Sequence, residues 1–218
     1  ITGGAGFIGS HLAETLLRKG YRIKVLDNLL RGNKLKNSVL SKIEFLKGDV
    51  RRSKDVIAAC KDCDTVFHFA AVLGVDIVAD SPVETMETEF LGMKNVADAS
   101  LRLGVKKVIY ASTSGIYGHS AIEKSFTETI SVDPRTSYAV AKRFNEIYLK
   151  ALYEERGLNS VSIRLFNVYG PRQDNRMVIR RFIEQARRGE DITVYGTGNQ
   201  TRDFTYIDDI TEVVVRLC

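Results

Sequence analysis

The chain of 218 residues has no tryptophan, and cysteine, proline and histidine occur only three times each. Three cysteines cannot build a disulfide framework, and Cys60 with Cys63 lacks the second cysteine pair that a zinc ribbon needs. We therefore expect free thiols beside the start of a strand, in a reducing compartment, and no metal site.

Long apolar runs and long runs of one charge are absent as well. No stretch approaches the ~20 apolar residues that cross a bilayer, and no signal peptide is found, so we expect a cytoplasmic protein without membrane association. The net charge of +5 comes from scattered basic residues rather than from a basic segment interleaved with aromatics. We therefore expect no nucleic-acid partner.

The sequence does contain short β-branched runs that alternate with longer amphipathic segments. This pattern is typical of βαβ units and predicts an α/β fold with a Rossmann-type, doubly wound parallel sheet. Gly20, Gly104, Gly157 and Gly189 each follow a helical segment, where a residue with positive φ easily ends a helix. Strands are expected at residues 22–26, 43–46, 65–69, 107–111, 160–165 and 192–194. Helices are expected at residues 7–19, 54–60, 83–103, 137–156 and 177–188.

A glycine-rich loop opens the chain. Gly4, Gly6 and Gly9 satisfy the pattern G-x-G-x-x-G directly before the first helix, and Gly3 extends it. The free N–H groups of a helix start can bind the pyrophosphate of a dinucleotide, while glycines let the backbone approach it. A tight strand-to-helix turn is the alternative.

Asp27 lies 18 residues after Gly9, directly after the strand expected at residues 22–26. A carboxylate there can accept hydrogen bonds from the adenosine ribose, and its charge repels a 2′-phosphate, so NAD is favoured over NADP. Arg31, close in sequence, weakens this preference, and a simple turn at residues 27–28 is the alternative role of Asp27.

Tyr138 and Lys142 stand four residues apart on the helix expected at residues 137–156, so they project from one face. A phenol with a pKa near 10 is a poor base at neutral pH, but a nearby ammonium stabilises the phenolate. Tyr138 could then take a proton from a sugar hydroxyl.

With these motifs the sequence resembles the extended short-chain dehydrogenase/reductases, in the nucleotide-sugar epimerase/dehydratase family that includes the UDP-glucose 4-epimerases. The resemblance covers nearly the whole chain. The matching segments are residues 2–11, 27–28, 48–50, 68–71, 112–114, 116–118, 164–167, 170–172 and 202–204, together with Tyr138 and Lys142.

The resemblance implies a set of site residues. Catalytic roles fall to Thr113, Tyr138 and Lys142. Cofactor contacts fall to Gly3, Gly6, Phe7, Ile8, Gly9, Asp27, Asn28, Asp49, Val50, Phe69, Ala70, Ala71, Tyr138, Lys142 and Phe166. Substrate contacts fall to Thr113, Asn167, Val178, Tyr195 and Arg202. The implied partners are a nucleotide-diphosphate sugar, UDP-linked, and a second copy of the chain in a homodimer.

The domain expectation follows from the same comparison. Residues 1–166 are expected to form the NAD-binding domain, and residues 167–218 part of a smaller substrate lobe interleaved with the last Rossmann elements. Because residue 1 already stands at the glycine loop, we expect the chain to be truncated at both ends. His11 and His68 are expected to be structural.

Two positions bear on the reaction. Dehydratases and decarboxylases of this family commonly carry Glu two residues after the active-site Thr, where this chain has Gly115, so a 4-epimerase through a 4-keto intermediate is favoured. Glu89 stands where the family usually has Asn, which leaves the role of that position open, and residues 72–76 are candidates to face the sugar. A 4,6-dehydratase, a UDP-glucuronate decarboxylase, a simple reductase and a non-catalytic NAD sensor are the alternatives.

Overall fold

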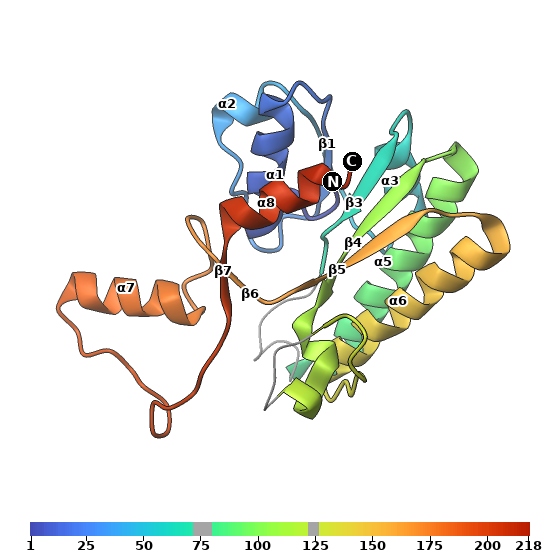
Figure 1. Ribbon diagram of the computed structural model, residues 1–218. Coiled ribbons are helices and arrows are strands. Elements are labelled where there is room, and N and C mark those ends of the chain that lie inside the picture. Colours follow the sequence, from blue (N-terminus) through green and yellow to red (C-terminus); the bar gives the residue numbers. More distant parts are fainter. Residues whose placement is uncertain (72–79, 122–126) are drawn as a thin grey trace.

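A parallel sheet forms the centre of the protein in the computed structural model, which describes residues 1–71, 80–121 and 127–218 (Figure 1). Thr2 bridges Leu26 on one side and His68 on the other, which joins two groups of strands in the order β2-β1-Thr2-β3-β4-β5. The strands are β1 (Lys24–Asp27), β2 (Glu44–Lys47), β3 (Thr65–His68), β4 (Lys107–Thr113) and β5 (Ser160–Leu165), and all their pairings are parallel. The predicted doubly wound fold is confirmed.

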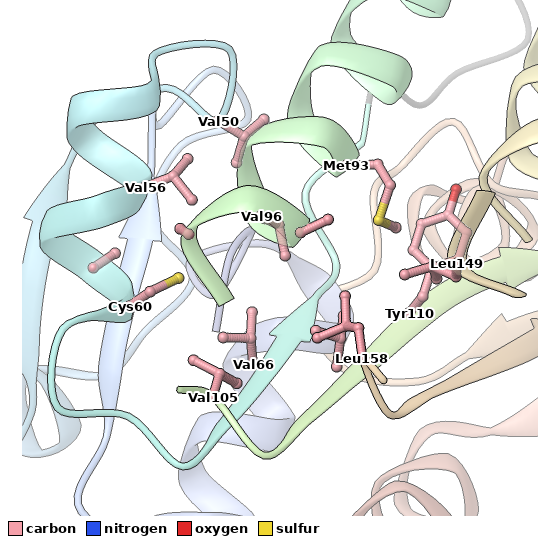
Figure 2. Close-up of a cluster of buried hydrophobic side chains, with 14 of the residues drawn as sticks. Val50, Val56, Cys60, Val66, Met93, Val96, Val105, Tyr110, Leu149 and Leu158 are labelled. Atoms are coloured by element: carbon pink, nitrogen blue, oxygen red, sulfur yellow. The ribbon is translucent and has the colours of Figure 1, made fainter. Parts of the chain in front are cut away.

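Helices cover both faces of this sheet. One face carries α1 (Phe7–Arg18), α2 (Asn37–Leu40) and α8 (Ile207–Arg216), and the other carries α3 (Ser53–Cys60), α5 (Pro82–Leu103) and α6 (Ser137–Arg156). Side chains alternate between the two cores along each strand. Val66 and Val108 enter the α3–α5–α6 core of Figure 2, while Phe67 and Ile109 enter the core beneath α1.

The helix boundaries follow from local chemistry. Thr136 caps α6 because its hydroxyl accepts a hydrogen bond from the Ala139 N–H at 3.1 Å. Gly104, Gly157 and Gly189 take the left-handed conformation directly after α5, α6 and α7 (Val178–Arg188). These predicted helix stops are therefore confirmed.

The C-terminal region departs from the prediction. β6 (Asn167–Tyr169) and β7 (Phe204–Tyr206) form a separate parallel pair that the sequence did not predict, and neither α8 nor the 3-10 helix η1 (Ser114–Ala121) was predicted. The strand expected at residues 192–194 is wrong. Ile192 and Val194 are about half exposed and pair with no strand of the described chain, so a β-branched run alone did not make a strand. Helix α7 extends away from the body in Figure 1 and buries none of its residues.

Cys60 lies in the core shown in Figure 2, and its burial raises the pKa of the thiol to about 11. Cys63 is half-buried, and both cysteines are free. Such a thiol is protonated at neutral pH and behaves as a small apolar side chain. None of the helices in the described ranges is both long and apolar enough to cross a membrane.

Candidate active site

The predicted cofactor residues gather at one edge of the sheet, where the parallel strands end. Asp27 ends β1, Phe69 follows β3, Thr113 ends β4 and Phe166 follows β5. Ligands of open parallel α/β sheets bind in the crevice outside this carboxyl edge. The fold thus brings together residues that lie up to 139 positions apart in the chain.

The glycine loop has the geometry that a pyrophosphate needs. A Cβ on Gly9 would lie 2.3 Å from the Gly3 carbonyl oxygen, and a Cβ on Gly3 would lie 2.6 Å from the Ala70 nitrogen. Gly6 precedes α1, and no side chain caps this helix start or places an acid in its first turn. The N–H groups of Phe7, Ile8 and Gly9 thus begin the helix without a side-chain acceptor, which suits an anionic ligand.

Asp27 ties this loop to the end of β1. Its Oδ2 accepts a hydrogen bond from the Ala5 N–H at 2.9 Å, and its Oδ1 accepts one from the Leu29 N–H at 2.8 Å. Both the turn and the loop contact are therefore present, and burial raises the pKa of the carboxyl. Arg31, which weakened the preference for NAD, forms an ion pair with Asp174 at 3.9 Å.

The residues predicted to meet the adenine lie beside the end of β2. Asp49 holds Arg51 in an ion pair of 2.7 Å, and this pairing lowers the pKa of the Asp49 carboxyl, with a smaller contribution from Asn28. The Val50 carbonyl accepts a hydrogen bond from Asn95 of α5 at 2.8 Å. Asn28, Asp49 and Val50 thus lie together just beyond the ends of β1 and β2.

The predicted catalytic residues lie on β4 and α6. Lys142 is 1 % exposed, and its Nζ lies 5.4 Å from the centre of the Tyr138 ring. Thr113, at the last position of β4, accepts a hydrogen bond from the Gly115 N–H at 3.1 Å through its hydroxyl. The pKa of Tyr138 in the protein alone is raised, first by burial and then by the charge of Glu89.

Glu89 is the charged group that adds to the effect of burial on the pKa of Tyr138. Its carboxylate is fully buried and lies 3.0 Å from the Lys142 ammonium, so a negative charge balances the cation beside Tyr138. Because the carboxylate contacts Lys142 inside the protein, Glu89 does not take the open position that a sugar-facing Asn would have. The sequence marked this position only as a departure from the family pattern.

A second polar cluster, which sequence reasoning missed, fixes the end of β4 against α6. Glu146 accepts hydrogen bonds from Ser112 at 2.6 Å and from Arg164 at 2.9 and 3.1 Å, and these bonds lower its pKa against the effect of burial. Arg164 also donates to Tyr117 at 3.0 Å. Ser112 precedes Thr113, so this cluster holds the catalytic strand end in place.

The predicted substrate residues are only partly brought together. Asn167 donates from Nδ2 to the Asp203 carbonyl at 3.1 Å, which places it beside the segment that carries Arg202. Tyr195 is 66 % exposed and accepts a hydrogen bond from Arg181, on the side of α7. Val178 begins α7 and is also exposed. Within the described residues, no contact links Tyr195 or Val178 to the catalytic residues, and residues 72–76 lie outside that part of the chain.

The two histidines that were expected to be structural have structural partners. His68 is buried, its Nδ1 lies 2.7 Å from the Thr2 hydroxyl, and burial lowers its pKa to about 3. His11 lies 2.9 Å from the Pro171 carbonyl, and Arg172 pairs with Glu14 of α1 at 2.6 Å. The motif at residues 170–172 therefore fastens the C-terminal region to α1.

Comparison with known proteins identifies the family of the chain. The model of the NAD dependent epimerase/dehydratase family matches residues 1–218. The chain is 38% identical over 225 residues to a UDP-N-acetyl-alpha-D-glucosaminuronate decarboxylase of Bacillus cytotoxicus, covering 99% of the chain and 69% of that protein. It is 34% identical over 217 residues to a putative UDP-glucose 4-epimerase of Methanocaldococcus jannaschii, covering 97% of the chain and 70% of the relative.

Solved structures show the same likeness. A UDP-glucose 4-epimerase of Thermotoga maritima, solved with UDP-glucose, superimposes with a TM-score of 0.92 at 34% identity, over 98% of the chain and 71% of that structure. The UDP-glucose 4-epimerase of Thermus thermophilus, in complex with NAD, gives a TM-score of 0.90 at 35% identity, over 99% of the chain and 72% of that structure. The chain therefore belongs to the NAD dependent epimerase/dehydratase family, and the prediction of NAD as its cofactor is confirmed.

Proposed function

We propose that the protein epimerises a UDP-linked hexose at carbon 4 through a transient 4-keto intermediate. The observation that carries this proposal is that the residue beside the Thr113 hydroxyl, at position 115, is a glycine. A Cβ built on Gly115 would lie 3.4 Å from the Thr113 hydroxyl oxygen, so the residue at this position borders the catalytic hydroxyl. Without a carboxylate here, the site lacks the further base that a 4,6-dehydratase needs.

The residues would divide the chemistry as follows. When bound, NAD accepts a hydride and returns it, and its oxidised ring adds a positive charge that favours the Tyr138 phenolate. Tyr138 takes the proton of the 4-hydroxyl and gives it back after the keto sugar has turned, while Thr113 hydrogen-bonds the same oxygen. Lys142, which donates to the Ala111 carbonyl at 2.8 Å, would stay beside the phenol throughout.

Cofactor binding would use the strand-end crevice. The glycine loop would hold the pyrophosphate, and Asp27 with Asn28 would bind the adenosine ribose. Asp49 and Val50 would meet the adenine, and Phe69, Ala70, Ala71 and Phe166 would line the middle of the cofactor. Asn167, Val178, Tyr195 and Arg202 would bind the nucleoside diphosphate, with the planar guanidinium of Arg202 suited to a phosphate.

The relatives support a UDP-sugar as the substrate class. The Thermotoga enzyme was solved with UDP-glucose, and a UDP-N-acetylglucosamine 4-epimerase of Methanobrevibacter ruminantium, solved with UDP-N-acetylmuramic acid, gives a TM-score of 0.91 at 34% identity. Both are larger than this chain, which spans 71% and 70% of them. We assign residues 1–166 to the NAD-binding domain and residues 167–218 to part of the substrate lobe, with α8 returning to pack on α1.

Decarboxylation of a UDP-linked uronic acid is the second candidate. The observation that favours it is the 38% identity to the Bacillus cytotoxicus decarboxylase, together with 33% identity to UDP-glucuronic acid decarboxylase 1 of Xenopus tropicalis, of which the chain spans 52%. Oxidation at carbon 4, in which NAD would accept the hydride, Tyr138 would accept the proton and Thr113 would hydrogen-bond the oxygen, serves this reaction equally well. The two reactions separate after the 4-keto intermediate, by loss of carbon dioxide or by return of the hydride to the opposite face of carbon 4.

We further propose that the protein is a homodimer built on α5 and α6. These helices pack on each other and leave an apolar face exposed, on which the Phe90 and Phe144 rings meet with centroids 5.2 Å apart. Val83 is 68 % exposed and Ile147 is 53 % exposed on the same pair of helices. Apolar patches of this kind mark interfaces, and a two-fold axis would bury the patch against its own copy.

The test of the catalytic assignment is Tyr138→Phe in the full-length protein. We expect loss of UDP-hexose epimerisation, by about 100-fold or more, because no proton can leave or return at the phenol position. NAD should remain bound, since the ring itself is kept. Epimerisation at the wild-type rate in this variant would contradict the mechanism, whereas loss of both NAD and turnover would show a cofactor defect instead.

A further inference from the structure

Glu89 and Lys142 form an ion pair that water does not reach. The carboxylate belongs to α5 and the ammonium to α6, their atoms lie 3.0 Å apart, and the side chains are 0% and 1% exposed. Burying two charges costs more free energy than their attraction repays in many proteins, so such a pair is weak evidence for stability. A buried pair of this kind one helical turn from an acid/base tyrosine is instead a candidate for function.

The ammonium of Lys142 joins three elements at the site. Besides Glu89 it donates to the Ala111 carbonyl of β4 at 2.8 Å, and it lies 4.7 Å from the centre of the Tyr110 ring. A lysine has three N–H donors, so these two acceptors leave one donor for a ligand or for Tyr138. Glu89 therefore fixes the direction in which that last donor points.

The groups around the pair are otherwise neutral. Tyr110 donates its hydroxyl to the Glu89 carboxylate at 3.3 Å and accepts a hydrogen bond from Asn145 at 2.9 Å. His68 stacks on Tyr110, and its pKa of about 3 keeps it uncharged at neutral pH. Among the described residues, Glu89 is the acid that pairs with Lys142, whereas Glu146, one turn further along α6, pairs with Arg143 and Arg164.

The cluster is also incompletely hydrogen-bonded, unlike an ordinary structural ion pair. Glu89 Oε1, Asn145 Oδ1 and His68 Nε2 are buried and have no hydrogen-bond partner within the described residues. Most buried polar atoms in folded proteins are paired, so three such atoms in one place indicate that the cluster is kept for more than packing.

We propose that Glu89 is a positioning residue for the reaction, whose carboxylate holds the Lys142 ammonium in place and balances its charge beside Tyr138. This inference rests on the proposed function for its kinetic part only. A negative charge at this place opposes formation of the phenolate and favours the oxidised, positively charged form of the cofactor. Burial and this charge together raise the pKa of Tyr138.

The experiment compares Glu89→Gln with Glu87→Gln in the full-length protein. Both changes remove one negative charge from α5, but Glu87 is exposed and Glu89 is buried. The first readout is the ratio of the dissociation constants of NAD and NADH, measured by titration calorimetry. In Glu89→Gln we expect the ratio to move toward NADH by about threefold or more, because NAD loses an attractive charge and NADH does not. Glu87→Gln should leave the ratio unchanged.

The second readout is the pH profile of kcat for UDP-hexose epimerisation. With the carboxylate removed, no negative charge offsets the Lys142 ammonium, so the pKa of Tyr138 should fall. The acidic limb of the profile should then move to lower pH by about one unit. Glu89→Asn introduces the residue that is usual in the family at this position, and it should move both readouts in the same direction as Glu89→Gln. This variant replaces Glu89→Gln if the latter folds poorly. If Glu89 supplies only a contact and no charge effect, its replacement would weaken the binding of NAD and NADH equally and leave the acidic limb of the pH profile unchanged. That result would overturn the proposal.

The two proposals fail differently. If the wild-type protein binds NAD and does not epimerise any UDP-hexose, the proposed function fails, and the cofactor ratio still decides the role of Glu89. If epimerisation occurs and the ratio and the pH limb of Glu89→Gln match those of Glu87→Gln, the inference fails and the proposed function stands.

Discussion

Replacing Lys142 by methionine leaves a buried carboxylate without its cation, and the structure sets the size of the effect. Glu89 is fully buried and its carboxylate lies 3.0 Å from the ammonium. Removing one partner of such a pair costs about 3–5 kcal/mol of the free energy of unfolding, because the remaining charge is neither solvated nor paired. Methionine has a similar length and leaves little empty space, so the loss reports on the charge.

The loss should depend on pH, and its sign follows from Glu89. Burial raises the pKa of this carboxyl in the folded protein above its ordinary value of 4.5, and without Lys142 it rises further. The folded variant then keeps a proton that the unfolded chain has released, so its stability falls as the pH rises from 4.5 toward the raised pKa, and it falls over a wider pH range than that of the wild type. The slope should reach at most about 1.4 kcal/mol per pH unit.

The assay is urea denaturation followed by far-ultraviolet circular dichroism at pH 5, 6, 7 and 8, with Lys142→Met, Glu89→Gln and the double variant. Removing the charge of Glu89 as well should recover most of the loss, so the double variant should lie within about 1 kcal/mol of wild type. A loss below about 1 kcal/mol in Lys142→Met, or a double variant less stable than either single variant, would refute the reasoning.

Two further predictions concern the loop and the dimer. Gly9→Ala places a Cβ 2.3 Å from the Gly3 carbonyl oxygen and should weaken NAD binding by about tenfold or more. Gly115→Ala, whose Cβ would lie 3.4 Å from the Thr113 hydroxyl oxygen, should change NAD binding by less than about twofold. Equal NAD dissociation constants for the two variants would contradict the loop geometry. Phe144→Asp should convert the dimer to a monomer, as measured by sedimentation velocity. Val213→Asp, which changes a similarly exposed side chain on α8, should leave the dimer intact. A dimer that survives Phe144→Asp would exclude the α5–α6 face as the dimer interface.

The features that the sequence predicted well are those that depend on neighbouring residues. Helix α6 has the predicted bounds because its N-terminal cap Thr136 and its terminal Gly157 both act within one turn of the helix. The glycine loop was predicted for the same reason, since its spacing and the helix after it are local. Strands β1 to β5 were found within two residues because short apolar runs mark them.

The features that the sequence missed depend on partners far along the chain. Glu89 is 53 positions from Lys142, so its departure from the family pattern could be noticed but its burial against the catalytic lysine could not. Glu146 likewise receives hydrogen bonds from Ser112 and Arg164, which belong to two different strands. The wrong strand at residues 192–194 shows the converse, because a β-branched run without a neighbouring strand gains nothing from the extended form.

We propose that the protein changes the configuration of a nucleotide sugar without changing its mass. The most direct measurement is incubation of the full-length protein with a panel of UDP-hexoses and UDP-uronic acids, followed by mass spectrometry and proton NMR of the products. We predict a UDP-hexose of unchanged mass with the opposite configuration at carbon 4. Release of carbon dioxide from a UDP-uronic acid would instead identify a decarboxylase, loss of one water would identify a dehydratase, and either result without epimerisation would contradict the account.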